Sequence, residues 1–209
     1  MPKGTRGAKG TKGVERVTEL KGKKIGFAVC GSFCTFKKAF EQVKVLKEAG
    51  ADVTAVMSFN AAQLDTRFGK AAEHIAFLEE VTGKPVIKTI PEAEPIGPKK
   101  MFDVLVIAPC TGNTLAKLSV GITDTPVTMA AKSHLRNSSP LVIAVSTNDG
   151  LSGSAKNIGA LLNYKNVYMV PYNQDDAAMK PRSLVADFEK LSDTIIGALD
   201  GVQIRPILY

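Results

Sequence analysis

The stretch LVIAPCTGNTLAKL, from Leu105 to Leu118, decides the fold class of this chain. Its apolar start belongs to a run from Val104 to Ala108, which is typical of a strand buried on both faces of a sheet. We expect this strand to stop at Pro109 and a helix to follow, capped by Asn113 or Thr114. Small hydroxyl and amide side chains at the end of a buried strand favour a ligand-binding turn.

Strands and helices alternate on both sides of this stretch. Hydrophobic residues at helical spacing predict helices that end at Gly50 and near Gly83, and Thr125 before Pro126 is a typical helix start. Further helices are expected within 147–163 and over 185–199, and loops over 58–64 and 91–100. The expected strands are KKIGFAV (23–29), DVTAVM (52–57), PVIKTI (85–90), DVLVIA (103–108), PLVIAVS (140–146) and NVYMVPY (166–172).

This alternation predicts an α/β fold: a three-layer, Rossmann-like (flavodoxin-like), mostly parallel sheet with helices on both faces. The 209 residues are enough for one such domain, which we expect over 21–209. Residues 1–20 are rich in Gly, Lys and Arg, and we expect them to be a disordered basic tail without a function of its own.

The composition argues against several classes of protein. No apolar run has the length of a membrane span and the N-terminus lacks the apolar core of a secretory signal, so we expect a cytoplasmic protein with no membrane partner. More than half of the net charge of +7 lies in the first 16 residues, so we expect no nucleic-acid partner. The three cysteines form no C-x-x-C pair and the two histidines fall within helical patterns, so we expect no metal site.

Polar residues follow four of the expected strands. Each of these polar residues, taken alone, is common at helix caps and in turns. The carboxyl ends of parallel strands meet at one edge of a sheet, however, so the four groups of polar residues are expected to lie together. Helix N–H groups and hydroxyls there can hold a phosphate without a lysine. GFAVCGSF has the spacing of neither G-x-G-x-x-G nor G-x-x-x-x-G-K-[ST], so a mononucleotide cofactor is favoured. The candidate cofactor-binding residues are Gly31, Ser32, Phe33, Ser58, Cys110, Thr111, Gly112, Asn113, Thr114, Ser146, Thr147 and Asn148.

Two segments carry a family resemblance. AVCGSFCTFKK (28–38) resembles the first phosphate and flavin turn of the flavoprotein family, which includes phosphopantothenoylcysteine decarboxylase, lantibiotic cysteine decarboxylases and flavin prenyltransferases. APCTGNTLAKLSVGITDTP (108–126) looks like the second signature of that family. The resemblance spans about residues 23 to 199 and implies that the cofactor is FMN.

Four segments resemble a narrower branch of this family, the B subunits of dipicolinate synthase. They are CGSFCTF (30–36), DTRFGKA (65–71), EAEPIGPKKMFDVLVIAPCTGNTLAKL (92–118) and VSTNDGLSGSAKNIG (145–159). This resemblance implies a part in converting a dihydrodipicolinate-type intermediate of lysine biosynthesis to dipicolinate (pyridine-2,6-dicarboxylate). It also implies the mother cell of a sporulating bacterium, the dipicolinate synthase A subunit with its own NAD(P) as partner, and a homo-oligomer, either a trimer or a dodecamer.

In this interpretation FMN accepts the hydride and no catalytic side chain is assigned. A dicarboxylate substrate needs cations, and the candidates are Arg67, Lys99, Lys100 and Arg136. The decarboxylases carry a histidine near the position of 94–96 and Pro-Ala-Met-Asn near 145–148, and this chain departs from both patterns. Two alternatives stay open: a non-redox scaffolding or regulatory partner of the A subunit, and a stand-alone flavin-dependent cysteine decarboxylase, which these departures disfavour.

Overall fold

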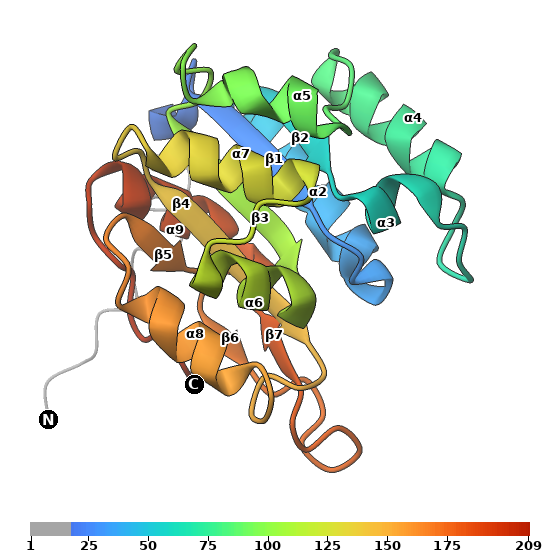
Figure 1. The fold of residues 1–209 in the computed structure, drawn as a ribbon, viewed down its shortest axis with the longest axis vertical. Coiled ribbons are helices and arrows are strands. Elements are labelled where there is room, and N and C mark those ends of the chain that lie inside the picture. Colours follow the sequence, from blue (N-terminus) through green and yellow to red (C-terminus); the bar gives the residue numbers. More distant parts are fainter. Residues whose placement is uncertain (1–17) are drawn as a thin grey trace, which may run out of the picture.

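The central strand of the molecule is β3 (Val104–Cys110), and every one of its residues is buried. It lies in a seven-stranded sheet with the order β2-β1-β3-β4-β7-β6, in which β5 also pairs with β4 (Figure 1). The pairs from β1 to β5 are parallel, whereas β7 pairs antiparallel with β4 and β6. The computed structural model describes residues 18–209. The predicted α/β class and the mostly parallel sheet are confirmed.

Short connections join the remaining elements. The other strands are β1 (Lys24–Val29), β2 (Asp52–Met57), β4 (Leu141–Thr147), β5 (Val167–Met169), β6 (Tyr172–Asn173) and β7 (Leu184–Ala186). The helices are η1 (Thr18–Leu20), η2 (Phe33–Thr35), α2 (Phe36–Glu48), α3 (Phe59–Gln63), α4 (Ala71–Thr82), α5 (Ile90–Ala93), η3 (Glu94–Ile96), α6 (Gly112–Val120), α7 (Pro126–Leu135), α8 (Ala155–Leu162), η4 (Phe188–Lys190) and α9 (Leu191–Leu199).

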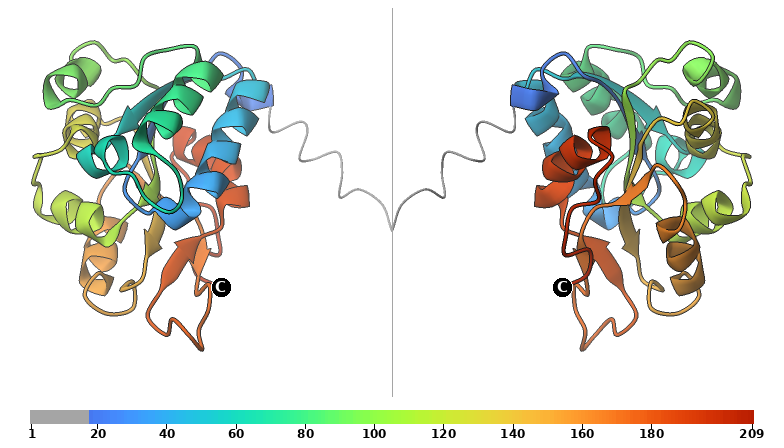
Figure 2. Two further views of the ribbon diagram at one scale, coloured as in Figure 1. Left: turned by 90° about the vertical axis from the view of Figure 1, so that its right-hand side faces the viewer. Right: turned by 90° about the vertical axis from the view of Figure 1, so that its left-hand side faces the viewer.

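Helices cover both faces of the sheet, as the side views in Figure 2 show. α2 and α9 pack on one face and contact each other there, and α6, α7 and α8 pack on the other. α4 lies against α2, α3 and the edge strand β2. The three-layer arrangement follows from strands that are apolar on both faces and therefore need cover on both sides.

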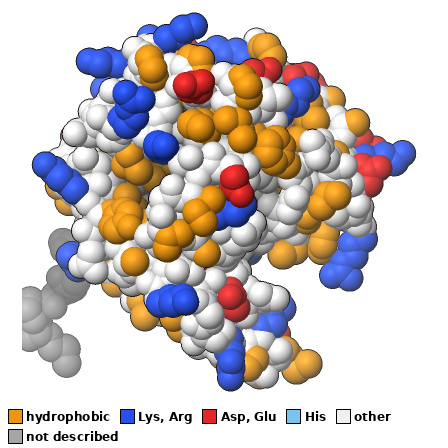
Figure 3. All heavy atoms as spheres, viewed as in Figure 1, with side chains coloured by type: hydrophobic (Ala, Val, Ile, Leu, Met, Phe, Trp, Pro, Cys, Tyr) orange, Lys and Arg blue, Asp and Glu red, His pale blue; other side chains and the backbone are white. Residues whose placement is uncertain are grey.

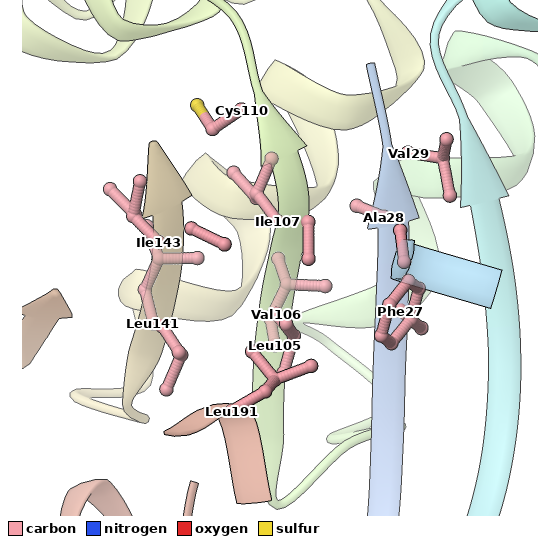
Figure 4. Packing of buried hydrophobic residues seen from close by; sticks show 14 of the residues in the cluster. Phe27, Ala28, Val29, Leu105, Val106, Ile107, Cys110, Leu141, Ile143 and Leu191 are labelled. Carbon is pink, nitrogen blue, oxygen red and sulfur yellow. The ribbon is translucent and has the colours of Figure 1, made fainter. Parts of the chain in front are cut away.

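The core is built on the three central strands. Phe27 of β1, Leu105 of β3 and Leu141 of β4 are completely buried, and Leu191 at the start of α9 lies close to them (Figure 4). Close packing of this kind leaves little room for strand movement. The polar turns that follow these strands are therefore held at fixed positions relative to one another.

Two of the predicted helix boundaries are confirmed and one is wrong. Thr125 caps α7 by accepting a hydrogen bond from the Thr128 N–H, and Gly83 ends α4 in the left-handed region with φ of 71°. The β3 strand continues through Pro109 to Cys110, so its expected end at Pro109 is one residue early. As a result Thr111, and not Asn113 or Thr114, caps α6.

The segment 85–90 does not form the expected strand. Only Ile87 pairs with β2, through its N–H to the Ala55 carbonyl (2.9 Å) and its carbonyl to the Met57 N–H (2.8 Å). Pro85 has no N–H, and Thr89 accepts a hydrogen bond as the cap of α5, so the pairing stops after one residue.

Short helices replace two of the expected loops. Ser58 caps α3 within 58–64, and Thr89 caps the helical turns α5 and η3 within 91–100. Hydroxyl side chains are common in turns and at helix starts alike, and at both of these positions they act as helix caps.

The C-terminal region departs most from expectation. The first residues of the predicted helix 185–199 belong to β7, and α9 begins only at Leu191. The predicted strand 166–172 is divided into β5 and β6 around Pro171, which cannot donate a ladder hydrogen bond. β7 pairs with the end of β4, which extends the sheet beyond the parallel strands.

The predicted tail over 1–20 falls largely on residues 1–17, which lie outside the described residues. Thr18–Leu20 form η1, and Leu20 is completely buried, so these three residues belong to the folded part of the chain. Between residues 18 and 209, no helix combines the length and the hydropathy needed to cross a lipid bilayer.

Candidate functional site

A cavity of about 1080 Å³ lies at the carboxyl ends of β1 and β4 and at the start of α6. Loop residues 67–68 and residues 175–185 of the β6–β7 hairpin form its outer walls. In Figure 3 the outline of the molecule is indented between these two regions. The cavity thus lies where open α/β sheets bind their ligands.

Three hydroxyl groups form a cluster on the floor of this cavity. The Ser32 Oγ lies 2.8 Å from the Ser146 Oγ, and the Thr35 Oγ1 lies 3.3 Å from the same atom. Thr35 also donates to the Ser32 carbonyl at 2.8 Å. The cluster joins the turn after β1 to the end of β4. Its three protons are used in these hydrogen bonds, which leaves hydroxyl lone pairs available to a ligand.

The start of α6 forms a second side of the cavity. Thr111 accepts a hydrogen bond from the Thr114 N–H and so caps the helix, while Gly112 and Asn113 line the cavity. The first N–H groups of a helix have no acceptor within it, and they carry the positive end of the helix dipole. This end of α6 is therefore suited to an anionic group such as a phosphate.

Gly112 occupies a position where a side chain does not fit. A Cβ atom there would lie 2.5 Å from the Ser154 Oγ, 2.8 Å from the Thr147 Oγ1 and 2.9 Å from an oxygen of Asp149. The close approach brings the backbone of the helix start against the end of β4 and the turn before α8. Glycine is required by this contact and not by an unusual φ.

Asp149 organises the polar residues behind Gly112. Its carboxylate accepts hydrogen bonds from the Thr147 hydroxyl at 2.5 Å and from the Ser154 hydroxyl at 2.8 Å. The bond from Thr147, with a smaller contribution from Ser154, holds the pKa of Asp149 below its usual range. The side chain is therefore a carboxylate at neutral pH and serves as a fixed acceptor, not as a proton donor.

Aromatic and basic side chains surround the polar floor. Phe33 and Phe68 both line the cavity, and the Arg67 guanidinium lies 4.8 Å from the ring centroid of Phe68. Lys38 and Lys180 also line it, and Lys180 pairs with Asp175 at 2.7 Å. The cavity therefore combines a polar floor, two apolar rings and cations near its mouth.

Nine of the twelve predicted cofactor-binding residues line the cavity together: Gly31, Ser32, Phe33, Thr111, Gly112, Asn113, Ser146, Thr147 and Asn148.

The remaining three lie outside it, and each has a structural role. Ser58 is buried and caps α3 through the Ala61 N–H. Cys110 is buried at the end of β3, and the hydroxyl of the buried Thr114 donates to the Cys30 Sγ at 3.2 Å. These residues support the turns that carry the lining residues.

Of the four predicted substrate cations, only Arg67 lines the cavity. Lys99 and Lys100 lie in a separate hollow beside the starts of β1 and β2, at the opposite edge of the sheet. Arg136 is exposed at the end of α7, which leads into the start of β4, and lines neither. These three residues therefore lie away from this cavity, because residues just before a parallel strand lie at its amino end, and their contact with substrate stays an untested prediction.

Neither histidine lines the cavity. Burial lowers the pKa of His134, whose Nε2–H donates to the Pro140 carbonyl at 3.0 Å. Burial also lowers the pKa of His74, which packs edge-on against Phe36 with ring centroids 5.0 Å apart. Both are neutral packing residues at pH 7 and are not placed to act as an acid or base in the cavity.

The two buried thiols, those of Cys30 and Cys110, are also weakly reactive. Burial raises the pKa of the Cys30 thiol to about 11 and that of Cys110 well above its ordinary value. Thiols with raised pKa values are weak nucleophiles and weak metal ligands at neutral pH. Cys34 is exposed and lines the cavity. In the region from 18 to 209, no cluster of three or more His, Cys, Asp or Glu residues is arranged to hold a metal ion.

The residues present fit an FMN molecule. The volume is in the range of small-molecule and cofactor sites, the start of α6 offers N–H donors to a phosphate, and the hydroxyl cluster offers partners for polar groups. Phe33 and Phe68 provide apolar surface for a ring system. The helix start and the hydroxyl cluster consist of neutral hydroxyl and N–H groups, and the basic side chains of Lys38, Arg67 and Lys180 line the same cavity.

Sequence reasoning missed several lining residues. Thr35, Lys38 and Asp149 directly extend the predicted ligand-binding turns, so their positions after the same strands were an available signal. Asp175 and Lys180 could not be found in this way, because the hairpin that carries them is built on long-range pairing between β4 and β7.

Comparisons with known proteins show the family of this chain. A model of the flavoprotein family matches residues 14–199. The B subunit of dipicolinate synthase from Bacillus subtilis (strain 168) is 45% identical over 192 residues, which are 92% of this chain and 96% of that protein.

Two solved structures share the fold. The crystal structure of the dipicolinate synthase B subunit from Bacillus halodurans C has 42% identity and a TM-score of 0.83, covering 91% of this chain and 97% of that one. The FMN-dependent cysteine decarboxylase SpaF has 23% identity and a TM-score of 0.64, covering 87% of this chain and 98% of that one.

Proposed function

Because this chain belongs to the flavoprotein family, and within it to the group of dipicolinate synthase B subunits, we propose that it binds FMN in the strand-end cavity and works as the B subunit of a dipicolinate synthase. The observation that carries the proposal is the convergence of the α6 start and the hydroxyl cluster on one cavity. The polar groups of a flavin mononucleotide match the N–H donors of the helix start and the acceptor lone pairs of the hydroxyl cluster.

The chain's own residues have separate tasks in this proposal. The N–H groups at Gly112 and Asn113 hold the phosphate, aided by the dipole of α6. Ser32 and Ser146 orient the polar part of the cofactor. Phe33 and Phe68 exclude water from the apolar part.

The substrate in this proposal is a small dicarboxylate, a dihydrodipicolinate-type intermediate. Its conversion to the aromatic ring of dipicolinate removes one hydride and one proton, with loss of water beforehand where the precursor is hydroxylated. Bound FMN supplies a two-electron acceptor for the hydride. Arg67 binds a carboxylate of the substrate, and the proton leaves to water, since no histidine lines the cavity.

The partner in this proposal is the dipicolinate synthase A subunit, which carries NAD(P) and can reoxidise the flavin. The protein works as a homo-oligomer, a trimer or dodecamer, in the cytoplasm of a bacterial cell during sporulation. A cysteine decarboxylase is not proposed, because neither histidine of the chain lines the cavity.

The test is a visible absorbance titration of the purified chain with FMN, followed by addition of the A subunit together with substrate in the absence of oxygen. We expect binding of one FMN per chain and bleaching of the flavin when substrate is added. A protein that stays colourless, yet is needed for the activity of its partner, would instead be a scaffold on a flavoprotein fold.

A matched pair of variants locates the cofactor. Asn113→Ala removes a lining amide, whereas Asn163→Ala removes the amide of a residue outside the cavity that bonds within α8. We expect FMN to bind more weakly to the first variant only. Equal affinity in both would mean that FMN does not lie against α6.

A further inference from the structure

A second hollow, of about 280 Å³, lies at the opposite edge of the sheet from the FMN cavity. It is formed where β1 and β2 begin, by the loop after α4 and by the loop that leads into β3. In Figure 3 Lys and Arg side chains gather along the upper rim of the molecule, the end at which β1 starts in Figure 1. The lining residues are Lys24, Asp52, Thr54, Lys84, Lys99, Lys100, Met101 and Phe102.

The hollow has a large excess of positive charge. Four of its eight lining residues are lysines and one is an aspartate. Lys84 pairs with Asp52 at 2.5 Å and lies 3.3 Å from the Thr54 hydroxyl. Within residues 18–209, Lys24, Lys99 and Lys100 have no carboxylate oxygen within 4.0 Å of their ammonium groups.

A further carboxylate beside the hollow, that of Asp103, is already engaged in a hydrogen bond. Asp103 follows the lining residue Phe102, and one of its oxygens accepts a hydrogen bond from the backbone N–H of Lys24 at 2.7 Å. Its charge is directed to the backbone at the start of β1. The three unpaired lysines therefore lack an anionic partner from the described protein.

The loop that carries Lys99 and Lys100 is firmly anchored. Gly97 donates its N–H to the Ser133 hydroxyl at 2.8 Å, and its carbonyl accepts from the Asn137 amide at 2.6 Å. A Cβ at Gly97 would lie 2.0 Å from the Ser133 carbonyl oxygen, so the loop is packed tightly against α7.

The backbone of this loop also takes an unusual conformation at a lysine. Lys100 has φ of 46°, in the left-handed region that favours glycine, and its N–H donates to the Gly97 carbonyl at 2.9 Å. The loop thus contributes two adjacent lysines to the lining of the hollow from a preorganised backbone. A preorganised loop lowers the entropic cost of binding a ligand.

We propose that this hollow binds a small phosphorylated anion with several negative charges, of which pyrophosphate is the simplest example. Its volume is about a quarter of that of the FMN cavity, so it suits a small anion and not a nucleotide cofactor. All four cations are lysines. Lysine binds phosphate as a point charge, whereas arginine is preferred for bidentate carboxylate pairs.

This inference does not depend on the proposed flavin function. The two sites lie at opposite edges of the sheet and share no lining residue. Binding of FMN and binding of pyrophosphate can therefore be measured on the same protein and can fail separately.

The test is calorimetric titration of pyrophosphate into the full chain at low ionic strength, both with FMN present in excess and without it. Excess FMN competes with pyrophosphate for the first cavity where FMN binds as proposed, and with or without FMN the binding that is lost in the test variant reports the hollow. The test variant is Lys99→Gln with Lys100→Gln. Its control is Lys165→Gln with Lys190→Gln, which removes the same charge at exposed positions that line neither cavity.

We expect saturable binding to the wild-type chain, about tenfold or more weaker in the test variant, and unchanged within about twofold in the control. Dipicolinate titrated in the same way is expected to lose less affinity through the test variant than pyrophosphate does, because its proposed site is at Arg67 in the first cavity. Circular dichroism and the unfolding temperature check that both variants fold.

Three outcomes overturn the proposal. If the wild-type chain shows no saturable binding, the hollow is a solvated group of lysines. If the control weakens binding as much as the test variant, the net charge of the protein and not the hollow is responsible. If the test variant loses as much affinity for dipicolinate as for pyrophosphate, the hollow does not select phosphates over carboxylates.

Discussion

The hydroxyl oxygens of Ser32 and Ser146 lie 2.8 Å apart although 114 residues separate them in the chain. Ser32 belongs to the turn after β1, and Ser146 lies near the end of β4, with β3 between these two strands in the sheet. The contact closes the floor of the cavity across the end of β3. It makes the cofactor site depend on the register of three strands.

Replacing Ser146 by alanine is expected to weaken both the fold and FMN binding. The change leaves the Ser32 hydroxyl without this partner and removes a contact of Thr35, which costs about 1 kcal/mol of unfolding free energy. We expect FMN to bind about fivefold more weakly. Urea unfolding and fluorescence titration measure the two effects.

Ser192 provides the control for this change. Its hydroxyl is buried in α9, on the far side of the sheet from α6, and has no hydrogen-bond partner among the described residues. Ser192→Ala should leave FMN affinity unchanged and cost no stability. If both alanine variants bind FMN like the wild-type chain, the hydroxyl cluster does not contact the cofactor.

Gly112→Ala is expected to damage the site, whereas Gly159→Ala is expected to stabilise the protein. A Cβ at Gly112 meets the Ser154 and Thr147 hydroxyl oxygens at 2.5 and 2.8 Å, so either α6 or the side chains bonded to Asp149 must shift, at a cost of about 1–3 kcal/mol. A Cβ at Gly159, inside α8, meets no atom within 4 Å and gains about 0.5–1 kcal/mol in helix stability.

Thermal unfolding and FMN titration of both variants check this expectation. The Gly112 variant should lose FMN affinity as well as stability, because the start of α6 is displaced. A Gly112→Ala protein that unfolds and binds FMN like the wild-type chain would show that the packing around Asp149 does not set the position of the helix.

Much of this site could be predicted because apolar runs end where polar residues begin. The ends of β1, β3 and β4 follow from that pattern, and parallel topology brings their turns to one edge. Which side chains in these turns are buried could not be predicted in the same way. Cys110 and Thr114 are adjacent to lining residues in the chain, yet the strand pleat and the helix rotation turn them into the core.

The position of Lys99 and Lys100 outside the cavity has a topological cause. Lys99 and Lys100 precede β3 directly, and residues before a parallel strand lie at its amino end, away from the carboxyl-edge cavity. The β6–β7 hairpin was missed for a different reason. Its strands have two and three residues, too short for any periodicity, and β4 holds them through long-range pairing.

The stability of the fold is expected to fall between about pH 7 and about pH 5. Burial lowers the pKa of both His134 and His74, so the folded state keeps them neutral while the unfolded chain takes up protons below its ordinary histidine pKa of about 6.5. Stability is therefore complete above that pKa and is lost as the pH falls toward the lowered values.

Urea unfolding at several pH values measures this dependence. His134→Gln keeps an N–H donor for the Pro140 carbonyl but cannot titrate, so its unfolding free energy should change less over this range. Measurements stay above pH 5, where the carboxylates with lowered pKa values remain charged. An identical pH dependence in the variant and the wild-type chain would show that His134 does not contribute to it.

Arg67 and Arg136 separate the role of the cavity from that of general surface charge. Both are arginines, but only Arg67 lines the cavity, where its guanidinium lies over the Phe68 ring. Arg67→Gln removes a charged hydrogen-bond donor and is expected to weaken dicarboxylate binding about tenfold or more. Arg136→Gln removes the same charge at the exposed end of α7 and should change dicarboxylate binding less than twofold.

FMN affinity should stay near the wild-type value in both variants, so that loss of dicarboxylate binding is assigned to the side chain and not to loss of cofactor. Dipicolinate titration of the FMN-loaded proteins decides the matter: equal losses in the two variants would mean that the positive charge of the whole chain, and not Arg67, attracts the dicarboxylate.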